Sequence, residues 1–337
     1  MKVTGKIIVL AYPDTFVAVS DEWICKFLPF VGLGTRRYIK AGHAALVLIE
    51  NETQIARYFD FGRYVTPPGH GRVRGANTDA ELEIPFKAKL AADNSLENIH
   101  EFLLWLDANP QKTHGEGRLL ASVCENVNFE KAENYIRNLQ ERGSVRYGAF
   151  SKTVSNCSRF VTDTLLAAAK EKHIHKALKF NKLFTPSAIG NVEKAATSVA
   201  IYEVQYGLVT LFRGTAFKEN IKNYFHRKKA PFKEVELPLL SENAQKLSGT
   251  GSNAWFELSV DKLANNQFRI KRFNDFHEND FDGVYETIEA FDPSLPYRFT
   301  YDSNCEYCHI LQNDKKIRFD KIRVYSEFNS LQKVHSA

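Results

Sequence analysis

HAALVLIE, residues 43–50, is a short run that is apolar from its second residue to its seventh. A second run, IARYFDFGRY, follows at residues 55–64 and is rich in aromatic and β-branched side chains. The four residues between them, NETQ, include the turn-favouring Asn51. Two strand-like runs separated by a short polar segment are typical of an antiparallel hairpin. The sequence therefore predicts an antiparallel hairpin over residues 43–64.

The register of this hairpin brings two polar side chains together. If NETQ is the turn, residue 50 pairs near residue 55, and His43 lies opposite roughly Gly62. Because side chains alternate between the faces of a strand, Asp60 shares the face of His43 as a diagonal neighbour. A carboxylate at that position can hold an imidazole by its second nitrogen. A histidine with only a structural role at the sheet edge is the alternative interpretation, and Tyr58 or Tyr64 also shares the face.

A cysteine stands at the start of a predicted helix more than a hundred residues later. SNCSRFVTDTLLAAA, residues 155–169, places Cys157 in the first turn, after Ser155 and Asn156, which are suited to capping. The first turn of a helix lowers the pKa of a thiol through its unsatisfied N–H groups and the macrodipole. A nucleophilic thiol also needs a base, and His43 is the candidate. The alternative is that Cys157 is a small buried side chain.

GHAALVLI at residues 42–49, followed by NCSRFVTDTL at 156–165, resembles the circularly permuted NlpC-like papain-fold enzymes. That group includes the YiiX-like bacterial proteins and the lecithin retinol acyltransferase-like proteins. The resemblance lies in the order of the motifs, in the glycine before the histidine, and in the Asn-Cys pair followed by an aromatic residue and valine. It covers roughly residues 1–195.

The resemblance implies an α+β fold in which an antiparallel sheet packs on the cysteine-bearing helix. It implies that Cys157 is the nucleophile, His43 the base and Asp60 the orienting residue of a thiol hydrolase or acyltransferase. The substrate would be a small peptide, an amide or an acyl ester, with no cofactor and no metal. The backbone N–H of Cys157 would form part of an oxyanion hole, and Tyr147 is a weaker candidate for a second donor. The alternative function is an inactive fold of this kind that binds a protein or a ligand.

The segment TPPGHGRVRGANTD, residues 66–79, is rich in glycine and proline and is predicted to be a long loop. It lacks the GKS or GKT ending of a phosphate-binding loop. We expect a mobile loop beside the cleft in which Arg72 or Arg74 could meet an anionic substrate. His70 in this loop is the main rival to His43 as the base.

CEYCH, residues 305–309, has the spelling of a c-type haem attachment site. Haem attachment requires export, and the motif falls in a predicted hairpin turn. A zinc or redox pair is the next alternative, but a second pair of ligands at suitable spacing is absent from the sequence. Coincidence is the interpretation we favour.

The pattern of the chain changes near residues 186–200. Helices are predicted before it, at 95–107 with Ser95 as the N-cap, at 128–143 and at 156–172. After it, short alternating runs predict an antiparallel β domain with one helix at AFKENIKNYFHRK, residues 216–228. The predicted domains are therefore residues 1–195, the permuted papain-like domain, and residues 196–337, a β-rich accessory domain of unknown role.

Composition and charge exclude several function classes. The 45 basic and 40 acidic residues of the 337-residue chain are nearly balanced, which argues against nucleic acid as a partner. Five scattered cysteines are unlike a disulfide framework. The sequence shows no signal peptide and no membrane-spanning segment, so we expect a cytoplasmic protein. It leaves the oligomeric state open.

Two further stretches can be interpreted as structural or as functional. WICKFLPFVGLG, residues 23–34, is apolar but interrupted, and either packs in the core or acts at a lipid surface. FHRKKAPFK, residues 225–233, is the densest basic stretch and reads as a solvated helix end or loop.

Overall fold

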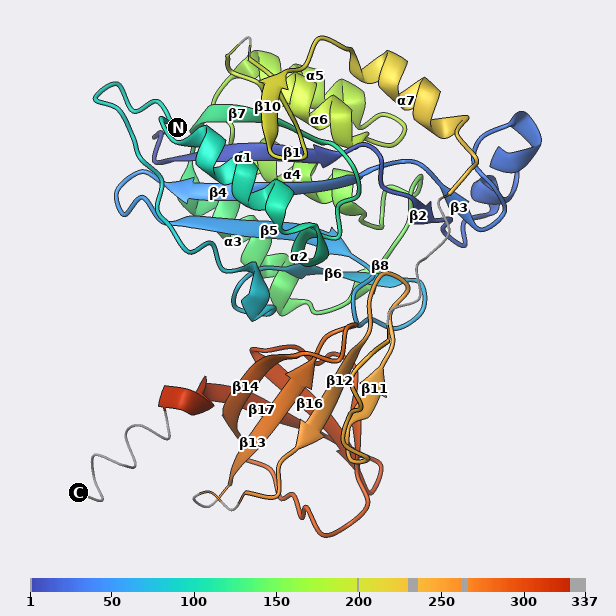
Figure 1. Ribbon diagram of the computed structural model, residues 1–337, viewed down its shortest axis with the longest axis vertical. Coiled ribbons are helices and arrows are strands. Elements are labelled where there is room, and N and C mark those ends of the chain that lie inside the picture. Colours follow the sequence, from blue (N-terminus) through green and yellow to red (C-terminus); the bar gives the residue numbers. More distant parts are fainter. Residues whose placement is uncertain (1, 199, 230–235, 262, 264–265, 328–337) are drawn as a thin grey trace. The chain divides into compact units, whose positions relative to one another are not determined.

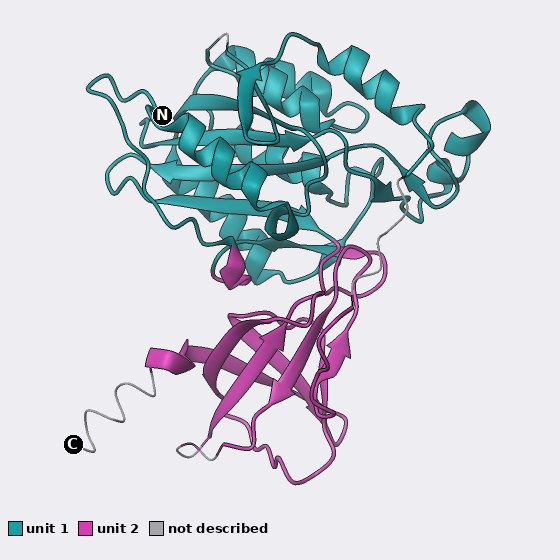
Figure 2. Ribbon diagram, viewed as in Figure 1, with its two compact units in different colours: residues 1–62, 71–76, 82–230 teal, residues 63–70, 77–81, 231–337 magenta. Residues whose placement is uncertain are grey.

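The structure is a computed structural model that describes residues 2–198, 200–229, 236–261, 263 and 266–327. The chain forms two compact units (Figure 2). Unit 1 consists of residues 1–62, 71–76 and 82–230, and unit 2 consists of residues 63–70, 77–81 and 231–337. In the described part of the chain no helix is long and apolar enough to cross a membrane.

Unit 1 combines one large sheet with a set of helices (Figure 1). Its strands are β1 (Gly5–Tyr12), β2 (Val17–Ala18), β3 (Tyr38–Ile39), β4 (His43–Glu50), β5 (Ala56–Gly62), β6 (His70–Arg74), β7 (Leu119–Val127), β8 (Val145–Arg146), β9 (Tyr202–Gln205) and β10 (Leu208–Leu211). Its helices are η1 (Trp23–Lys26), η2 (Leu28–Val31), α1 (Ile99–Ala108), α2 (Pro110–Thr113), α3 (Phe129–Glu141), α4 (Cys157–Ala168), α5 (Lys172–Asn181), α6 (Ala188–Ala195) and α7 (Ala216–Tyr224).

The large sheet has the strand order β10-β9-β7-β1-β4-β5-β6-β8. The predicted hairpin is confirmed: β4 pairs antiparallel with β5, and the N–H of Glu50 bonds the carbonyl of Ile55 at 3.1 Å. Ala45 lies opposite Asp60, which is the register expected when His43 is opposite Gly62. The mixed helix-and-sheet architecture of the prediction is likewise present.

Both faces of the sheet are covered, which explains why HAALVLIE is a continuous apolar run rather than an alternating one. Ala44, Leu46 and Leu48 of β4 pack in one core with side chains of α3, α4, α5 and α6. Ala45, Val47 and Ile49 face the other core, to which α1 contributes. The sheet is therefore a buried layer. The N-terminal end of β4, an interior strand of this sheet, is held in place by its neighbours β1 and β5.

Unit 2 is built on a single antiparallel sheet in the order β11-β12-β13-β14-β17-β16-β15. The first and last strands of this order approach one another, because the side chain of Gln245 accepts a bond from Phe299 N at 2.8 Å. The sheet is thus nearly closed into a barrel around its own apolar core. The strands are β11 (Gln245–Leu247), β12 (Ala254–Leu258), β13 (Gln267–Phe273), β14 (Asn279–Glu286), β15 (Arg298–Thr300), β16 (Tyr307–Gln312) and β17 (Lys315–Val324).

The division of the chain differs from the predicted domains of 1–195 and 196–337. Strands β9 and β10 extend the sheet of unit 1, and α7 packs on α6, so unit 1 runs to residue 230. The strand pattern of residues 202–211 is correct, but the partner is the first sheet. The sequence of an edge strand is compatible with pairing to either sheet, so the tertiary structure decides which sheet it joins.

Local differences have identifiable causes. Residues 66–79 contain strand β6, which pairs with β5, so the prediction of one long loop was wrong. Helix α1 begins at Ile99 rather than near Ser95, because Ser95 bonds Asp93 in a turn. The helix predicted at 128–143 is α3, and Asn128 caps it by accepting a bond from Lys131 N.

Candidate active site

Cys157 is the first residue of α4, and its position is fixed from both sides. Asn156 is the N-cap: its side-chain oxygen accepts a bond from Arg159 N at 2.9 Å, as its residue type predicts. Its side-chain amide donates to the carbonyl of Gly148 at 2.8 Å. Asn156 therefore ties the start of the helix to the preceding loop. The thiol lies where the helix macrodipole favours an anion.

His43 is the first residue of β4 and lies next to the end of β1, opposite Tyr12. The preceding Gly42 has φ of 76°, a conformation that favours glycine. A Cβ at this glycine would lie 3.1 Å from the carbonyl oxygen of Tyr12. The Gly-His pair of the sequence therefore has a backbone reason, because the glycine lets the chain turn into the strand. His43 is only 5 % exposed.

Asp60, on β5, links His43 to a buried arginine. Its Oδ2 lies 3.2 Å from Nε2 of His43, and its two oxygens accept bonds from Nε and Nη2 of Arg74 at 3.0 and 2.6 Å. The hydroxyl of Tyr58 also donates to Oδ2 at 3.2 Å. All three partners come from β4, β5 and β6. The carboxylate is completely buried, so its charge depends on these donors.

The electrostatics of the site favour a charged pair. Burial alone would raise the pKa of Cys157, but its hydrogen bond and charge interaction with His43 lower that pKa below its ordinary value. Burial would lower the pKa of His43, but hydrogen bonds to Asp60 and Cys157 raise it to about 9. Burial opposes ionisation of Asp60, while the charge of Arg74 and the bond to His43 hold its pKa well below the usual range. Both shifts in the Cys157–His43 pair favour thiolate and imidazolium.

The other four cysteines behave differently from Cys157. Burial raises the pKa of Cys124 and of Cys305 to about 12, and it also raises the pKa values of Cys25 and Cys308. All five thiols are unpaired and buried, so burial by itself does not separate them. The histidine beside Cys157 makes the difference. The arrangement can therefore supply a nucleophile and a proton donor at the same point.

The weaker site predictions fall into two groups. Tyr147 stacks on Phe61, with ring centroids 6.2 Å apart, and lies against the core that contains Cys157. Arg74 is not in a mobile loop but buried in β6 on Asp60, and Arg72 is buried in the same strand. The expectation that either arginine lies on a mobile loop is therefore wrong. His70 Nδ1 lies 3.0 Å from the carbonyl of Pro68, whereas His43 is the histidine that interacts with Cys157.

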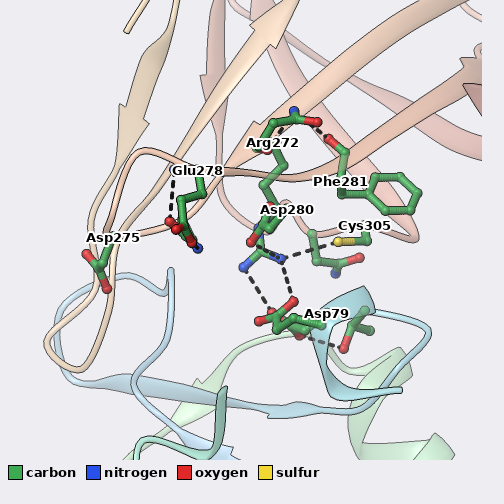
Figure 3. Close-up of polar contacts among 12 residues, drawn as sticks. Asp79, Arg272, Asp275, Glu278, Asp280, Phe281 and Cys305 are labelled. Atoms are coloured by element: carbon green, nitrogen blue, oxygen red, sulfur yellow. Dashed lines mark hydrogen bonds and ion pairs between the residues drawn. The ribbon is translucent and has the colours of Figure 1, made fainter. Parts of the chain in front are cut away.

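The CEYCH motif lies in unit 2, where both cysteines are buried. Cys305 contacts the guanidinium of Arg272, with Nη1 3.3 Å from the sulfur, and Arg272 Nη2 bonds Asp79 at 3.1 Å (Figure 3). Cys308 lies in β16, and its thiol donates to the carbonyl of Asn304. Among the described residues, no group of three or more His, Cys, Asp and Glu side chains is arranged to hold a metal ion. The thiols of this motif are parts of a protein core.

Two contributors to the site were not predicted. Arg74 was assigned a different role, although a fully buried carboxylate on an aromatic strand signals the need for a cation. The second contributor is Glu22, whose carboxylate accepts bonds from the backbone N–H groups of Phe150 at 3.1 Å and Ser151 at 2.8 Å, and also from Ala149. This carboxylate holds the loop that leads to Cys157. The sequence around Glu22 does not indicate this role. Its partners are backbone N–H groups more than a hundred residues later, and no side-chain pattern marks them.

Comparison with known proteins identifies similarities for parts of both units. Residues 7–174, just under half of the chain, match the family model described as Type VI secretion system effector TseH-like. This range contains His43, Asp60 and Cys157. Residues 244–322 match the model of the DUF6695 C-terminal domain. None of the curated proteins matches the chain.

Among solved structures, the crystal structure of the Type VI secretion system effector TseH is similar to this chain at 20 % sequence identity. The match covers 63 % of this chain and 99 % of that chain, with a TM-score of 0.41. The resemblance to YiiX-like and lecithin retinol acyltransferase-like proteins stays a prediction, since neither match bears on those groups.

Proposed function

We propose that unit 1 is a cysteine-dependent hydrolase that works through an acyl-enzyme on Cys157. The observation that carries this proposal is the contact geometry: Cys157, at the first position of α4, interacts with His43, and Nε2 of His43 lies 3.2 Å from Oδ2 of the buried Asp60. These contacts lower the pKa of the Cys157 thiol and raise that of His43 to about 9. A thiol that is merely buried has its pKa raised, as the other four cysteines do. An activated thiol beside an oriented imidazole is the arrangement that nucleophilic catalysis requires.

The reaction follows from the positions of these groups. The thiolate of Cys157 attacks the carbonyl carbon of an amide or ester, and the oxygen of the tetrahedral intermediate takes the negative charge. The backbone N–H of Cys157, at the first position of α4, is a donor for that oxygen. The His43 imidazolium gives its proton to the leaving amine or alcohol. Water, deprotonated by His43, then releases the acid; a different acceptor would make the reaction an acyl transfer.

The roles of the supporting residues follow from their contacts. Asp60 accepts from Nε2 of His43, so the other ring nitrogen is the one that exchanges a proton with Cys157. Arg74 keeps Asp60 ionised and is therefore a positioning residue. The order histidine strand, carboxylate strand, cysteine helix is what a circularly permuted NlpC-like papain fold would have, and we assign unit 1 to that fold as part of the proposal.

The match to TseH-like effectors supports a role for this site outside the cell that makes the protein. A Type VI secretion effector is delivered to a target cell, so the amide or ester that Cys157 attacks would belong to that cell. A small peptide, an amide or an acyl ester remains the substrate class. Unit 2, with its own fold, would then serve in recognition or delivery.

The first test is the rate of iodoacetamide alkylation against pH, followed by peptide mapping of all five cysteines. We expect Cys157 to be labelled well below pH 8.5, which is about the pKa of a free thiol. In His43→Gln, the labelling profile of Cys157 should move to higher pH, because the charge partner is lost. The four other thiols serve as internal controls, and their slow labelling should be alike in both proteins.

The alternative function is a binding module whose site is not used in catalysis. It predicts that Cys157 is alkylated with the pH dependence of an ordinary thiol and that this dependence is unchanged in His43→Gln. That result would contradict the proposed hydrolase. If activation is found, incubation with panels of peptide amides and acyl esters should form a covalent acyl adduct on Cys157. Mass spectrometry of the intact protein detects this adduct, and Cys157→Ser is the control.

A further inference from the structure

A segment of unit 1 that contributes little to the core exposes several large apolar side chains. Between β2 and β3, which pair with each other in a separate two-stranded sheet, the chain forms η1 and η2, and Cys25 is the single buried residue of these two helices. The exposed fractions of the large side chains are 69 % for Trp23, 59 % for Phe27, 77 % for Phe30 and 65 % for Val31. Exposed aromatic side chains that lie together mark an interaction surface. Trp23 contacts Phe27, and Phe27 contacts Phe30, with ring centroids 6.0 and 6.4 Å apart.

The end of α7 joins this segment, although it lies about two hundred residues away in the sequence. Arg227 donates from Nη2 to the carbonyl of Pro29 at 2.8 Å, and Gly34 N donates to the carbonyl of Tyr224 at the same distance. In Figure 1 the chain that follows α7 lies beside the segment that contains β3. Phe225, 56 % exposed, lies against Gly32, where a Cβ would be 3.1 Å from its ring. The described part of the basic stretch 225–233 is therefore placed beside the aromatic residues; residues 230–233 lie outside the described residues.

We call residues 23–37 and 225–229 together the aromatic–basic face. Its exposed cations come from both segments, and its exposed acidic neighbour in the sequence is Asp21. Glu22 also lies in this part of the chain and is ionised, but its carboxylate is held by backbone N–H groups of residues 149–151. The exposed cations are Lys26, Arg36, Arg37, Arg227, Lys228 and Lys229.

From this combination we propose that the aromatic–basic face binds the surface of an anionic lipid bilayer. Trp and Phe side chains fit the boundary between headgroups and acyl chains, and Lys and Arg around them are attracted to anionic headgroups. Because Cys25 is the one residue of η1 and η2 that is buried, the exposed Trp23, Phe27, Phe30 and Val31 can insert into the bilayer without loss of the core. The face binds to the membrane surface and does not span the bilayer.

The aromatic–basic face is connected along the chain to His43 and by Glu22 to the loop before Cys157. The segment lies between β2 and β3, which pair with each other in a separate two-stranded sheet, and the chain enters the large sheet at His43 shortly after β3. Glu22 connects it to the loop that leads to Cys157. Bilayer binding would therefore hold the start of β4, which carries His43, and the start of α4, which carries Cys157, near the lipid. This consequence is separate from the binding itself, which needs no catalysis.

The test is co-sedimentation of the full-length protein with vesicles of phosphatidylcholine alone and of phosphatidylcholine mixed with phosphatidylglycerol. We expect binding to the mixed vesicles that weakens as salt is added. Phe27→Ser with Phe30→Ser should reduce the partition coefficient by about ten-fold or more, because two apolar side chains are removed from the interface. Lys228→Gln with Lys229→Gln should reduce it by about five-fold for each charge removed.

A matched control uses a second pair of exposed phenylalanines in unit 1. Phe180 and Phe184 are 72 % and 80 % exposed, and Phe180 lies in α5, which also carries Lys172, Lys176 and Lys179. Phe180→Ser with Phe184→Ser should leave binding unchanged, and thermal melts should show that both double variants are folded. Cys157→Ser should bind like the unaltered protein, so the result does not depend on the proposed hydrolase.

Three results would overturn the proposal. Absence of binding to both vesicle types would leave a protein partner as the occupant of the face. Equal binding to neutral and anionic vesicles would remove the role of the cations. Loss of binding in the Phe180 and Phe184 variant, but not in the Phe27 and Phe30 variant, would assign the membrane surface to α5.

Discussion

Asp60 is the residue on which the polar part of the candidate site depends. It is fully buried and bonds His43, Tyr58 and Arg74, so two cationic groups share one carboxylate. The sequence brought His43 and Asp60 together through the hairpin register, and Ala45 opposite Asp60 confirms that register. It did not assign Arg74 to Asp60, because that contact depends on β6 pairing with β5, and residues 66–79 have the composition of a loop.

At this residue, Asp60→Asn should be strongly destabilising. The substitution leaves the 1 %-exposed Arg74 without its counter-charge, and breaking a buried pair in this way costs about 3–5 kcal/mol. The measurement is the free energy of unfolding in urea. Arg74→Gln added to Asp60→Asn should recover part of the loss, and a double variant that is no more stable than Asp60→Asn would contradict the role assigned to Arg74.

Asp280 in unit 2 gives a prediction of pH dependence. Burial raises its pKa to about 6, partly offset by Arg272, and neither carboxylate oxygen accepts a hydrogen bond in the described part of the chain. A pKa raised in the folded state means that the protonated form favours folding below the unfolded pKa of about 4. That stability is lost as the pH rises from about 4 through about 6.

Asp280→Asn should therefore stabilise unit 2 at pH 7.5 by up to about 3 kcal/mol and should flatten its stability between about pH 4 and 6. Arg272 keeps Asp79 and Glu81 as counter-charges in the variant. Thermal melts across this pH range measure the effect. A variant that is less stable than the unaltered protein at pH 7.5 would show that Arg272 needs the third carboxylate.

Among the elements, helix α4 connects local sequence most directly to the site. Asn156 was predicted from its type and place, and it caps the helix as expected. Asn156→Ala should lower stability by about 1 kcal/mol, because Arg159 N loses its acceptor. Asn156→Ser should restore the cap while losing the bond to Gly148. Denaturant unfolding measures stability, and the alkylation profile of Cys157 reports on the thiol. Equal stability of the two variants would contradict the capping role.

For single elements, the sequence predicted whether a segment is a helix or a strand, but it did not predict which other elements that segment packs against. β9, β10 and α7 have the predicted secondary structure, yet they belong to unit 1. Periodicity reports which side chains of an element are apolar, and it does not say which sheet or helix covers them. The same reasoning applies to η1 and η2, whose apolar residues suggested a core segment but lie exposed.

For the molecule as a whole, the cysteines allow the two units to be followed separately. Cys25, Cys124 and Cys157 lie in unit 1, and Cys305 and Cys308 lie in unit 2. Phe256 is completely buried in unit 2, so Phe256→Ala should destabilise that unit by about 3–5 kcal/mol. Alkylation of Cys305 and Cys308 should then accelerate, while the pH profile of Cys157 stays unchanged. A parallel change at Cys157 would show that the two units unfold as one.

By itself the sequence determined the hairpin, its register, the helix that begins at Cys157, and the pairing of His43 with Asp60. These features rest on short-range rules: strand alternation, turn composition and capping act within a few residues. The tertiary structure decided the rest. Arg74 reaches Asp60, Glu22 holds the loop before Cys157, and residues 225–229 join residues 23–37 because distant segments pack together. Such contacts depend on chain closure over long separations, for which no local pattern of residues carries the information.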